Sequence, residues 1–171
     1  MNFLRSSCLL TFLAFVGHSL PNFLILFADD LGYGDLSYNG HPTISTPNVD
    51  QIAREGMILT QWYSGFHVCS PSRASLLTGR LPPRTGCAGP WVGGVFPSAA
   101  IGGLPHYEIT FAQQLKGIGY KTKIIGKWHL GERQEFLPYN YGFDEFFGLP
   151  YSVNNATIAT HLCGNQKHGN Y

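Results

Sequence analysis

The sequence has few charged residues and lacks several patterns that point to particular classes of protein. Only 12% of its 171 residues are charged, and the formal net charge is +1. No basic run is present, so the electrostatic signature of a nucleic-acid-binding protein is missing. No C-x-x-C pair occurs, which excludes a zinc ribbon. Low-complexity segments and internal repeats are absent, and 44% hydrophobic residues suffice for one domain with a core.

Residues 1–19 have the pattern of a secretory signal peptide. Arg5 supplies the positive end, residues 6–17 supply a short apolar core, and Gly17-His18-Ser19 has small residues at the positions that signal peptidase reads. The apolar run is too short to span a bilayer comfortably. The alternative to a cleaved signal peptide is an N-terminal membrane anchor. We therefore expect passage through the oxidising secretory lumen.

Cysteines are few, and their number is informative. Cys8 would leave with the signal, so Cys69, Cys87 and Cys163 remain. Because three is an odd number, at least one of them must be free, modified or paired outside this chain.

Apolar runs predict strands at 22–28, 57–63 and 121–126, of which the first ends at Asp29-Asp30. Helices are expected from Thr46 to Gly56, with Val49, Ile52 and Ala53 on one face, from Ser70 to Gly79, and from Thr110 to Leu115. The stretch 80–104 and the aromatic segment after 126 are expected to be loops. Alternating strands and helices indicate an α/β class with a mainly parallel sheet, whose sites lie beyond the carboxyl ends of strands.

Asp29 and Asp30 are adjacent carboxylates at the end of an expected buried strand. Two such groups repel each other and resist desolvation unless a cation lies between them. Carboxylate oxygens suit Ca²⁺ or Mg²⁺. The alternative is an Asx-type turn before Gly32, with both carboxylates in water.

Lys127 and His129 are two residues apart and point to the same side of an extended segment. A cation beside a titratable imidazole suits an anionic substrate and a proton transfer. A solvated lysine and a histidine satisfied by the backbone are the alternative.

Cys69 begins an expected helix, where the backbone N–H groups and the helix dipole favour an anion. Arg73 lies one turn further on the same face. A thiol in this position is expected to be acidic and reactive. The alternative is a structural half-cystine paired with Cys87 or Cys163.

Taken together, these stretches resemble the sulfatase family. Its signature C-x-P-S-R-x-x-x-L-T-G-R is filled at every fixed position from Cys69 to Arg80. A-D-D-L-G-Y-G-D at 28–35 resembles the family's first metal motif, and G-K-W-H-L-G stands intact at 126–131. G-F-D-E-F-F-G-L-P-Y-S resembles the following segment of arylsulfatase A-like members. The resemblance implies an alkaline-phosphatase-like sulfatase fold with a mainly parallel sheet flanked by helices.

The resemblance also implies how Cys69 is used. In this family the cysteine is oxidised in the endoplasmic reticulum to Cα-formylglycine, which hydrates to a geminal diol. One hydroxyl attacks the sulfur of a sulfate ester, and the second then expels sulfate. The implied function is hydrolysis of aryl or carbohydrate sulfates, with a formylglycine-generating enzyme as a partner.

The resemblance implies a role for each matching residue. Asp29, Asp30 and the modified Cys69 would bind Ca²⁺, with Mg²⁺ as the second choice. Arg73 and Lys127 would hold the formylglycine and the developing charge, and Lys127 would also contact the substrate. His129 would act on the diol proton, and Ser152 resembles a substrate-contacting serine. Asn155 begins an N-glycosylation sequon.

The chain departs from the family pattern in length. A second metal pair, Asp followed by Asn, and a further His and Lys are expected well downstream of Tyr171. We therefore expect residues 20–171 to be the N-terminal portion of a sulfatase domain, with an incomplete fold and no activity of its own. A truncated, non-catalytic product is the alternative function. A related phosphatase is disfavoured, because such enzymes use Ser or Thr as nucleophile. The expected location is the lysosome or the extracellular space.

Overall fold

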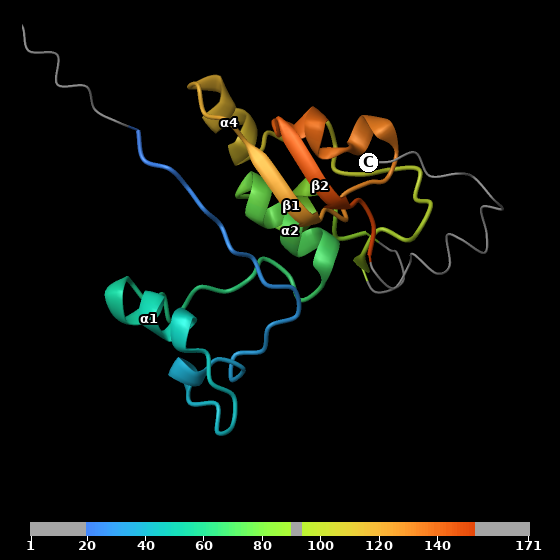
Figure 1. Cartoon of the computed structure of the whole chain (residues 1–171). Helices are drawn as coiled ribbons and strands as arrows, with labels where there is room; N and C mark the ends of the chain where they lie inside the picture. Colours follow the sequence, from blue (N-terminus) through green and yellow to red (C-terminus); the bar gives the residue numbers. More distant parts are fainter. Residues whose placement is uncertain (1–19, 90–93, 153–171) are drawn as a thin grey trace, which may run out of the picture.

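The computed structural model describes residues 20–89 and 94–152, which form two differently packed regions (Figure 1). We call residues 20–68 the arm and residues 69–152 the body. The arm extends away from the body in Figure 1 and carries the helix α1 at its far end. No described residue of the arm is buried, whereas every buried residue belongs to the body. The body therefore contains the hydrophobic core.

The sheet of the described residues consists of β1 (Lys123–Lys127) and β2 (Glu145–Leu149), which pair in parallel. The register places Lys123 opposite Glu145 and Lys127 opposite Leu149. Residues 128–144 connect the two strands through the 3-10 helices η3 (Gln134–Phe136) and η4 (Pro138–Tyr141). A parallel pair requires such a long crossover. Parallel strands with flanking helices confirm the predicted α/β class.

The expectation of a loop after residue 126 is wrong for β2. Its burial alternates, with Phe146 half-buried and Phe147 exposed, so one face of the strand packs on the body. Gly148 lies directly against Gly126 of β1, and a Cβ atom there would lie 1.9 Å from the Gly126 carbonyl oxygen. The lack of a side chain at Gly148 therefore permits close strand pairing.

The helices of the body are α2 (Cys69–Thr78), α3 (Pro82–Thr85) and α4 (Phe111–Gly117). Helices α2 and α4 share a core with the crossover, and α3 packs against α2. The predicted end of α2 at Gly79 is confirmed, because Gly79 takes the left-handed conformation with a φ of 66°. The predicted start of α4 is also confirmed, since Thr110 and Gln113 form a reciprocal capping box. The expected long loop from residue 80 contains the short helix α3.

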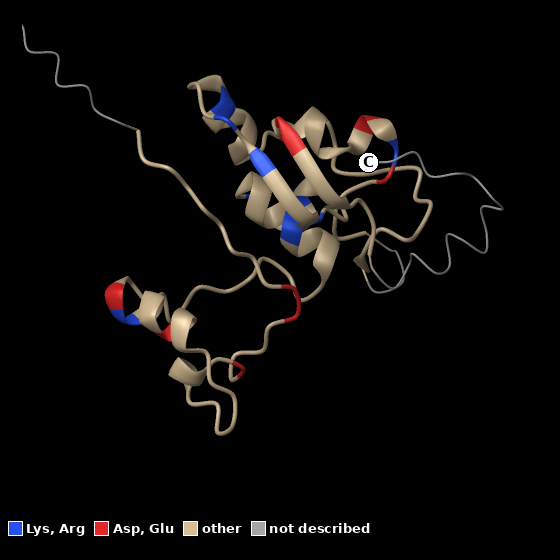
Figure 2. Cartoon of the chain, in the orientation of Figure 1, with Lys and Arg blue, Asp and Glu red and all other residues tan. Residues whose placement is uncertain are grey.

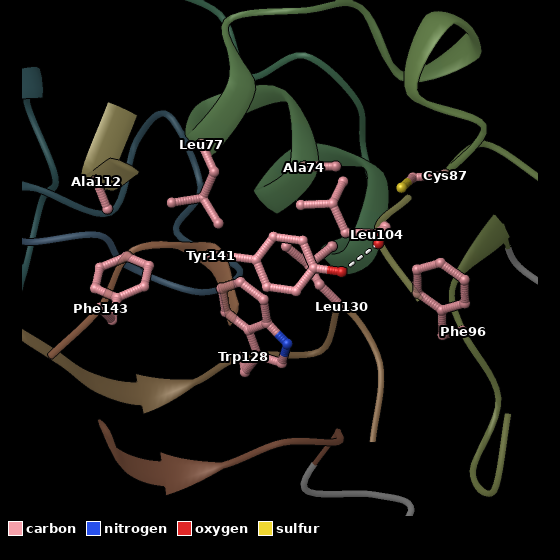
Figure 3. Packing of buried hydrophobic residues seen from close by; sticks show 10 residues of the cluster. All are labelled: Ala74, Leu77, Cys87, Phe96, Leu104, Ala112, Trp128, Leu130, Tyr141 and Phe143. Carbon is pink, nitrogen blue, oxygen red and sulfur yellow. Dashed lines mark hydrogen bonds between the residues drawn. The ribbon is translucent and has the colours of Figure 1, made fainter. Parts of the chain in front are cut away.

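The core lies between α2, α4 and the crossover (Figure 3). Trp128 and Tyr141 are its largest side chains, and Leu104 and Leu130 are fully buried beside them. The Tyr141 hydroxyl donates to the Leu104 carbonyl, as the dashed line in Figure 3 shows. A polar tip is thus satisfied inside an apolar cluster.

Helix α1 (Pro47–Glu55) forms where the sequence predicted it, but its apolar face is not covered. Val49 is 41% exposed and Ile52 is 63% exposed. Thr46 precedes the helix without accepting a capping bond from it, and its hydroxyl donates instead to the Asp50 carboxylate over 2.9 Å. The helix is therefore placed by local polar contacts and not by a core.

The strands predicted at 22–28 and 57–63 are not formed, and both segments are exposed. A strand needs hydrogen-bonding neighbours, and neither run pairs with β1 or β2. The first run approaches the body through Tyr120, whose hydroxyl donates to the Pro21 carbonyl over 2.8 Å and whose ring lies 5.7 Å from that of Phe23. Apolar composition alone did not reveal whether a neighbour was available.

Within residues 20–89 and 94–152, no helix combines the length and apolar character that crossing a membrane requires. The expected signal peptide, Cys8, Cys163 and Asn155 lie outside the described residues.

Candidate active site

The candidate site forms where the first turn of α2 meets the carboxyl end of β1. Cys69 is the first residue of α2, and the buried residues Pro71, Ala74 and Leu77 anchor this helix on the body. Val68 precedes it in an extended conformation and contributes no side-chain cap. The N-terminal N–H groups of α2 are thus left near the partly exposed Cys69 side chain, in an environment that favours negative charge.

Lys127 brings a positive charge to Cys69 from the end of β1. Its Nζ atom lies 3.0 Å from Cys69 Sγ and 2.9 Å from a carboxylate oxygen of Asp29. Burial alone lowers the pKa of Lys127, but the contacts with Cys69 and Asp29 outweigh burial and raise that pKa above its ordinary value. Lys127 therefore remains a cation at the point where it meets the cysteine.

Arg73 provides the second cation. Its Nη2 atom lies 3.2 Å from Asp29, its Nη1 atom donates to the Lys127 carbonyl, and its guanidinium lies 5.6 Å from the Phe27 ring centroid. Burial alone raises the pKa of Asp29, but Lys127 and Arg73 outweigh it and hold that pKa below its ordinary value. The arm thus meets the body through a carboxylate held between two cations. Figure 2 shows that charged residues are sparse along the described chain.

His129 lies in the core next to this cluster and is 2% exposed. Its backbone N–H donates to the Pro150 carbonyl over 3.0 Å, and its Nε2 atom lies 3.0 Å from the Phe96 carbonyl oxygen. A carbonyl can only accept, so Nε2 carries the proton and Nδ1 of the neutral ring is an acceptor. Nδ1 is buried and has no hydrogen-bond partner among the described residues.

The pKa of His129 favours the neutral ring. Burial lowers this pKa, and the charges of Lys127 and Arg73 lower it further, which outweighs the opposing effects of Phe96 and Asp29. The backbone of His129 has a φ of 55°, in the left-handed region. Because β1 ends at Lys127, the two-residue period used to align Lys127 with His129 does not extend to His129. Its position is set by Phe96 and Pro150 instead.

Two predicted residues stand apart from these contacts. Asp30 is exposed, has a φ of 59°, and forms no hydrogen bond or ion pair with the described part of the chain. Ser152 is half-buried two residues after Pro150, so it lies beyond the carboxyl end of β2. The expected alternative of an Asx turn is not formed by Asp29 or Asp30, because the Gly32 N–H donates to Asp35.

The cysteines do not pair within the described residues. Cys69 and Cys87 are both free thiols, so a bridge between them is not formed. Cys87 is buried in the core, and burial raises the pKa of its thiol, which keeps it protonated and inert. Of these two thiols, Cys69 is therefore the more accessible one.

The donor chemistry of Asp29 and Asp30 fits a hard cation such as Ca²⁺, but only as part of a coordination shell. Ca²⁺ takes six to eight oxygen ligands. Both Asp29 oxygens already face Arg73 or Lys127, and within the described ranges no group of three or more His, Cys, Asp or Glu residues could hold a metal. A Ca²⁺ ion held here would need further oxygen ligands besides these two carboxylates.

The sequence did not predict three backbone and hydroxyl groups that complete the site. The Phe96 and Pro150 carbonyls orient His129, and the Ser70 hydroxyl accepts the Phe96 N–H over 3.1 Å. Backbone carbonyls leave no signal in residue identity, and the stretch that contains Phe96 has no readable motif.

Comparison with known proteins finds similarity along most of the chain. The sulfatase family model matches residues 21–165. The chain is 52% identical to arylsulfatase A from Bos taurus over 147 residues, which are 85% of this chain and 28% of that protein. It is 50% identical to N-acetylgalactosamine-6-sulfatase from Sus scrofa, over 76% of this chain and 26% of that protein.

Solved structures give the same result. The PsFucS1 sulfatase from Pseudoalteromonas sp. superposes with a TM-score of 0.62 and 42% identity over 74% of this chain and 25% of that one. Ps i-CgsB in complex with k-i-k-neocarrahexaose superposes with a TM-score of 0.67 and 34% identity over 72% of this chain and 27% of that one. The chain thus spans about a quarter of the length of each of these relatives.

Proposed function

Because this chain belongs to the sulfatase family, we propose that the protein hydrolyses sulfate esters with a nucleophile made from Cys69. The observation that carries the proposal is the placement of Cys69 Sγ at the start of α2, 3.0 Å from the Lys127 ammonium. An anionic substrate group is favoured at this point by the helix N-terminus and by two cations. Aryl and carbohydrate sulfates are the proposed substrates, supported by the names of the relatives.

Formylglycine supplies a hydrated aldehyde, of which one hydroxyl attacks sulfur and the other allows sulfate to leave. To form it, the Cβ carbon of Cys69 is oxidised from thiol to aldehyde, sulfur leaves as hydrogen sulfide, and an external oxidant such as molecular oxygen takes the electrons. A formylglycine-generating enzyme is the proposed partner for this step. The half-exposed Cys69 is compatible with such access.

Lys127 and Arg73 position the nucleophile and stabilise negative charge. Lys127 already contacts the Cys69 side chain, and Arg73 fixes the end of β1 by donating to the Lys127 carbonyl. Cations fixed before reaction stabilise charge that develops on the sulfate oxygens without having to reorganise. Ser152 is proposed to contact the substrate from the end of β2.

His129 is proposed to accept the diol proton at Nδ1. The Phe96 carbonyl holds the other nitrogen, which leaves Nδ1 with a lone pair and no partner among the described residues. Burial, together with the charges of Lys127 and Arg73, lowers the pKa of His129 and so favours the unprotonated form of this atom. The tautomer and the direction of the pKa shift therefore both suit a general base.

Asp29, Asp30 and the modified Cys69 are the proposed ligands of Ca²⁺, together with residues outside the described chain. The bound ion would supply Lewis-acid polarisation of the sulfate oxygens. Asp29 would then exchange part of its contact with Arg73 and Lys127 for the ion, since both of its oxygens face those cations. The two cations would be released toward the substrate.

The remaining proposals concern the route of the protein through the cell. A signal peptide at 1–19, a sulfatase-domain portion from residue 20 to 171, and glycosylation at Asn155 are consistent with a lysosomal or extracellular location. The second candidate function is a chain without activity of its own. It is favoured by the ion pairs of both Asp29 oxygens with Arg73 and Lys127, which compete with a metal ion for this carboxylate.

The test is release of sulfate from a chromogenic aryl sulfate by the enzyme that contains this sequence. Cys69→Ala is expected to abolish turnover, whereas Cys87→Ala, which removes a thiol of the core, retains it. The 171-residue chain alone is expected to be inactive. Undiminished turnover by Cys69→Ala refutes the role of Cys69, and turnover by the short chain refutes the proposed incompleteness.

A further inference from the structure

The segment that follows residue 95 joins the two sides of the candidate site. The Phe96 N–H donates to the Ser70 hydroxyl over 3.1 Å, directly beside Cys69 in α2. The Phe96 carbonyl lies 3.0 Å from His129 Nε2. The backbone N–H and carbonyl of Phe96 therefore connect α2, which carries Cys69, with the proposed base His129. Whatever fixes this segment also fixes the orientation of the His129 ring.

The turn after Phe96 has a strained backbone held by a side chain. The Ala100 N–H donates to the Pro97 carbonyl over 3.1 Å, and Ala99 has a φ of 59°. The left-handed region is unfavourable for alanine, because its Cβ atom then lies too close to the following carbonyl oxygen. The Ala99 N–H donates to Glu132 Oε2 over 3.1 Å, which stabilises this conformation. Glu132 thus holds the turn from the loop that also carries His129.

Glu132 is placed at a cost in free energy. Burial raises the pKa of its carboxyl group, although the hydrogen bond from Ala99 opposes this shift. Its Oε1 atom and the Ser98 hydroxyl are buried without a hydrogen-bond partner in the described part of the chain. A buried acceptor that lacks a partner is destabilising. The position of Glu132 is therefore not explained by stability alone.

The chain between His129 and Glu132 is closely packed. A Cβ atom on Gly131 would lie 2.4 Å from Phe136 Cβ, and Gly131 has a φ of 125°. The preceding Leu130 is fully buried, and its carbonyl accepts the Leu104 N–H over 2.8 Å. A displacement at Glu132 is consequently transmitted to His129 instead of being absorbed by the loop.

We propose that Glu132 is a positioning residue, which holds the turn at residues 97–100 so that the Phe96 carbonyl fixes His129 in the tautomer protonated at Nε2. Without the Glu132 contact, Ala99 relaxes from its left-handed conformation and the Phe96 carbonyl moves away from the imidazole. His129 then distributes its proton between both nitrogens, and Nδ1 is less often a free acceptor. The inference deepens the proposed function, because it rests on His129 acting as a base at Nδ1.

The direct test is the tautomer of His129, measured by ¹⁵N NMR on the whole protein labelled with ¹⁵N-histidine. The wild-type protein is expected to show a protonated Nε2 and an unprotonated Nδ1 above the pKa of the ring. Glu132→Ala is expected to move both ¹⁵N shifts toward a mixture of tautomers. Glu132→Gln keeps an acceptor for the Ala99 N–H and is expected to restore the wild-type spectrum.

A matched control and a kinetic measurement separate positioning from general destabilisation. Glu135→Ala removes an exposed carboxylate three residues away and is expected to change neither the spectrum nor the turnover. In the active enzyme, Glu132→Ala is expected to lower kcat about ten-fold with KM unchanged, as for an impaired base. Glu132→Gln is expected to remain close to wild type.

The outcomes are distinguishable from those that test the proposed function. A wild-type tautomer in Glu132→Ala overturns the inference, even if Cys69→Ala has abolished activity as expected. If Glu132→Ala does not fold, Glu132→Asp keeps the charge but withdraws the oxygen from Ala99. An altered spectrum in the aspartate variant, with a normal one in Glu132→Gln, supports the inference, and two normal spectra overturn it.

Discussion

The arm and the body contain similar apolar side chains but bury them very differently. Leu24 in the arm is 84% exposed, whereas Leu130 in the body is fully buried. The arm has apolar runs as long as those of the body, yet no residue between 20 and 68 is buried. An apolar segment can therefore be buried only if other parts of the chain pack against it, and its own sequence does not show whether they do.

The two regions nevertheless meet at the residues with the clearest chemistry. Asp29 from the arm lies between Arg73 and Lys127 of the body, and the Phe27 ring lies beside the Arg73 guanidinium. This contact is polar and involves few residues, so we expect it to contribute little to folding and much to the site. The comparison thus predicts that substitutions in the arm affect function more than stability, and that those in the body affect both.

The largest expected difference between arm and body is the effect of an arm substitution on activity. Asp29→Asn removes the charge that faces both cations and a proposed metal ligand, so kcat/KM is expected to fall by at least about 100-fold. Because the Asp29 side chain is 41% exposed, the free energy of unfolding is expected to change by less than about 1 kcal/mol. Sulfate release and urea unfolding measure the two quantities. A stability loss as severe as the activity loss contradicts the division between arm and body.

The next effect is on stability and belongs to the body. Leu130→Ala leaves a cavity beside Trp128 and Tyr141, which is expected to lower the free energy of unfolding by about 2–5 kcal/mol. Urea unfolding followed by tryptophan fluorescence reports this change. A loss below about 1 kcal/mol would mean that the core of the body does not determine its stability.

A smaller effect depends on pH and concerns the start of both strands. The ion pair with Lys116 over 2.8 Å, and hydrogen bonds from Thr122, lower the pKa of Asp144 from its ordinary 3.8 to about 2. This stabilisation is complete above the ordinary pKa and is lost as the pH falls from 3.8 to about 2. Asp144→Asn is expected to flatten the fall in stability across that range in acid titrations. If the stability of the variant falls with pH in the same way as that of the wild type, Asp144 does not stabilise the protein through its lowered pKa.

The smallest effect is expected in the arm. Leu24→Ser replaces a highly exposed leucine, so the free energy of unfolding is expected to change by no more than about 0.5 kcal/mol. The matched variant is Leu104→Ser, which places a hydroxyl in the core and is expected to be strongly destabilising. Equal effects of the two substitutions on urea unfolding would erase the distinction between the regions.

The sequence predicted elements whose ends have local signals. Thr110 caps α4 and Gly79 ends α2, because side-chain acceptors and left-handed glycines act within a few residues. The strands at 22–28 and 57–63 failed because a strand depends on a distant partner. The sequence did not predict β2, because the segment E-F-F-G-L forms a strand only through its pairing with β1.

The candidate site was predicted at the level of residue identity and not of contacts. The motifs indicated Cys69, Arg73 and Lys127, and the structure brings these three residues together with Asp29. They could not indicate that the Phe96 carbonyl sets the His129 tautomer, because a backbone group has no residue type. The contribution of Asp30 to a metal site stays a prediction, since it has no partner among the described residues.

The most direct measurement of the central claim is the mass of the tryptic peptide 55–73 from protein isolated from the secretory pathway. This peptide contains Cys69, and peptide 85–116 of the same digest contains Cys87 as an internal reference. The account predicts that peptide 55–73 has lost H₂S and gained one oxygen, while the thiol of Cys87 keeps its sulfur. An intact thiol at Cys69, or a disulfide from it, would contradict the account.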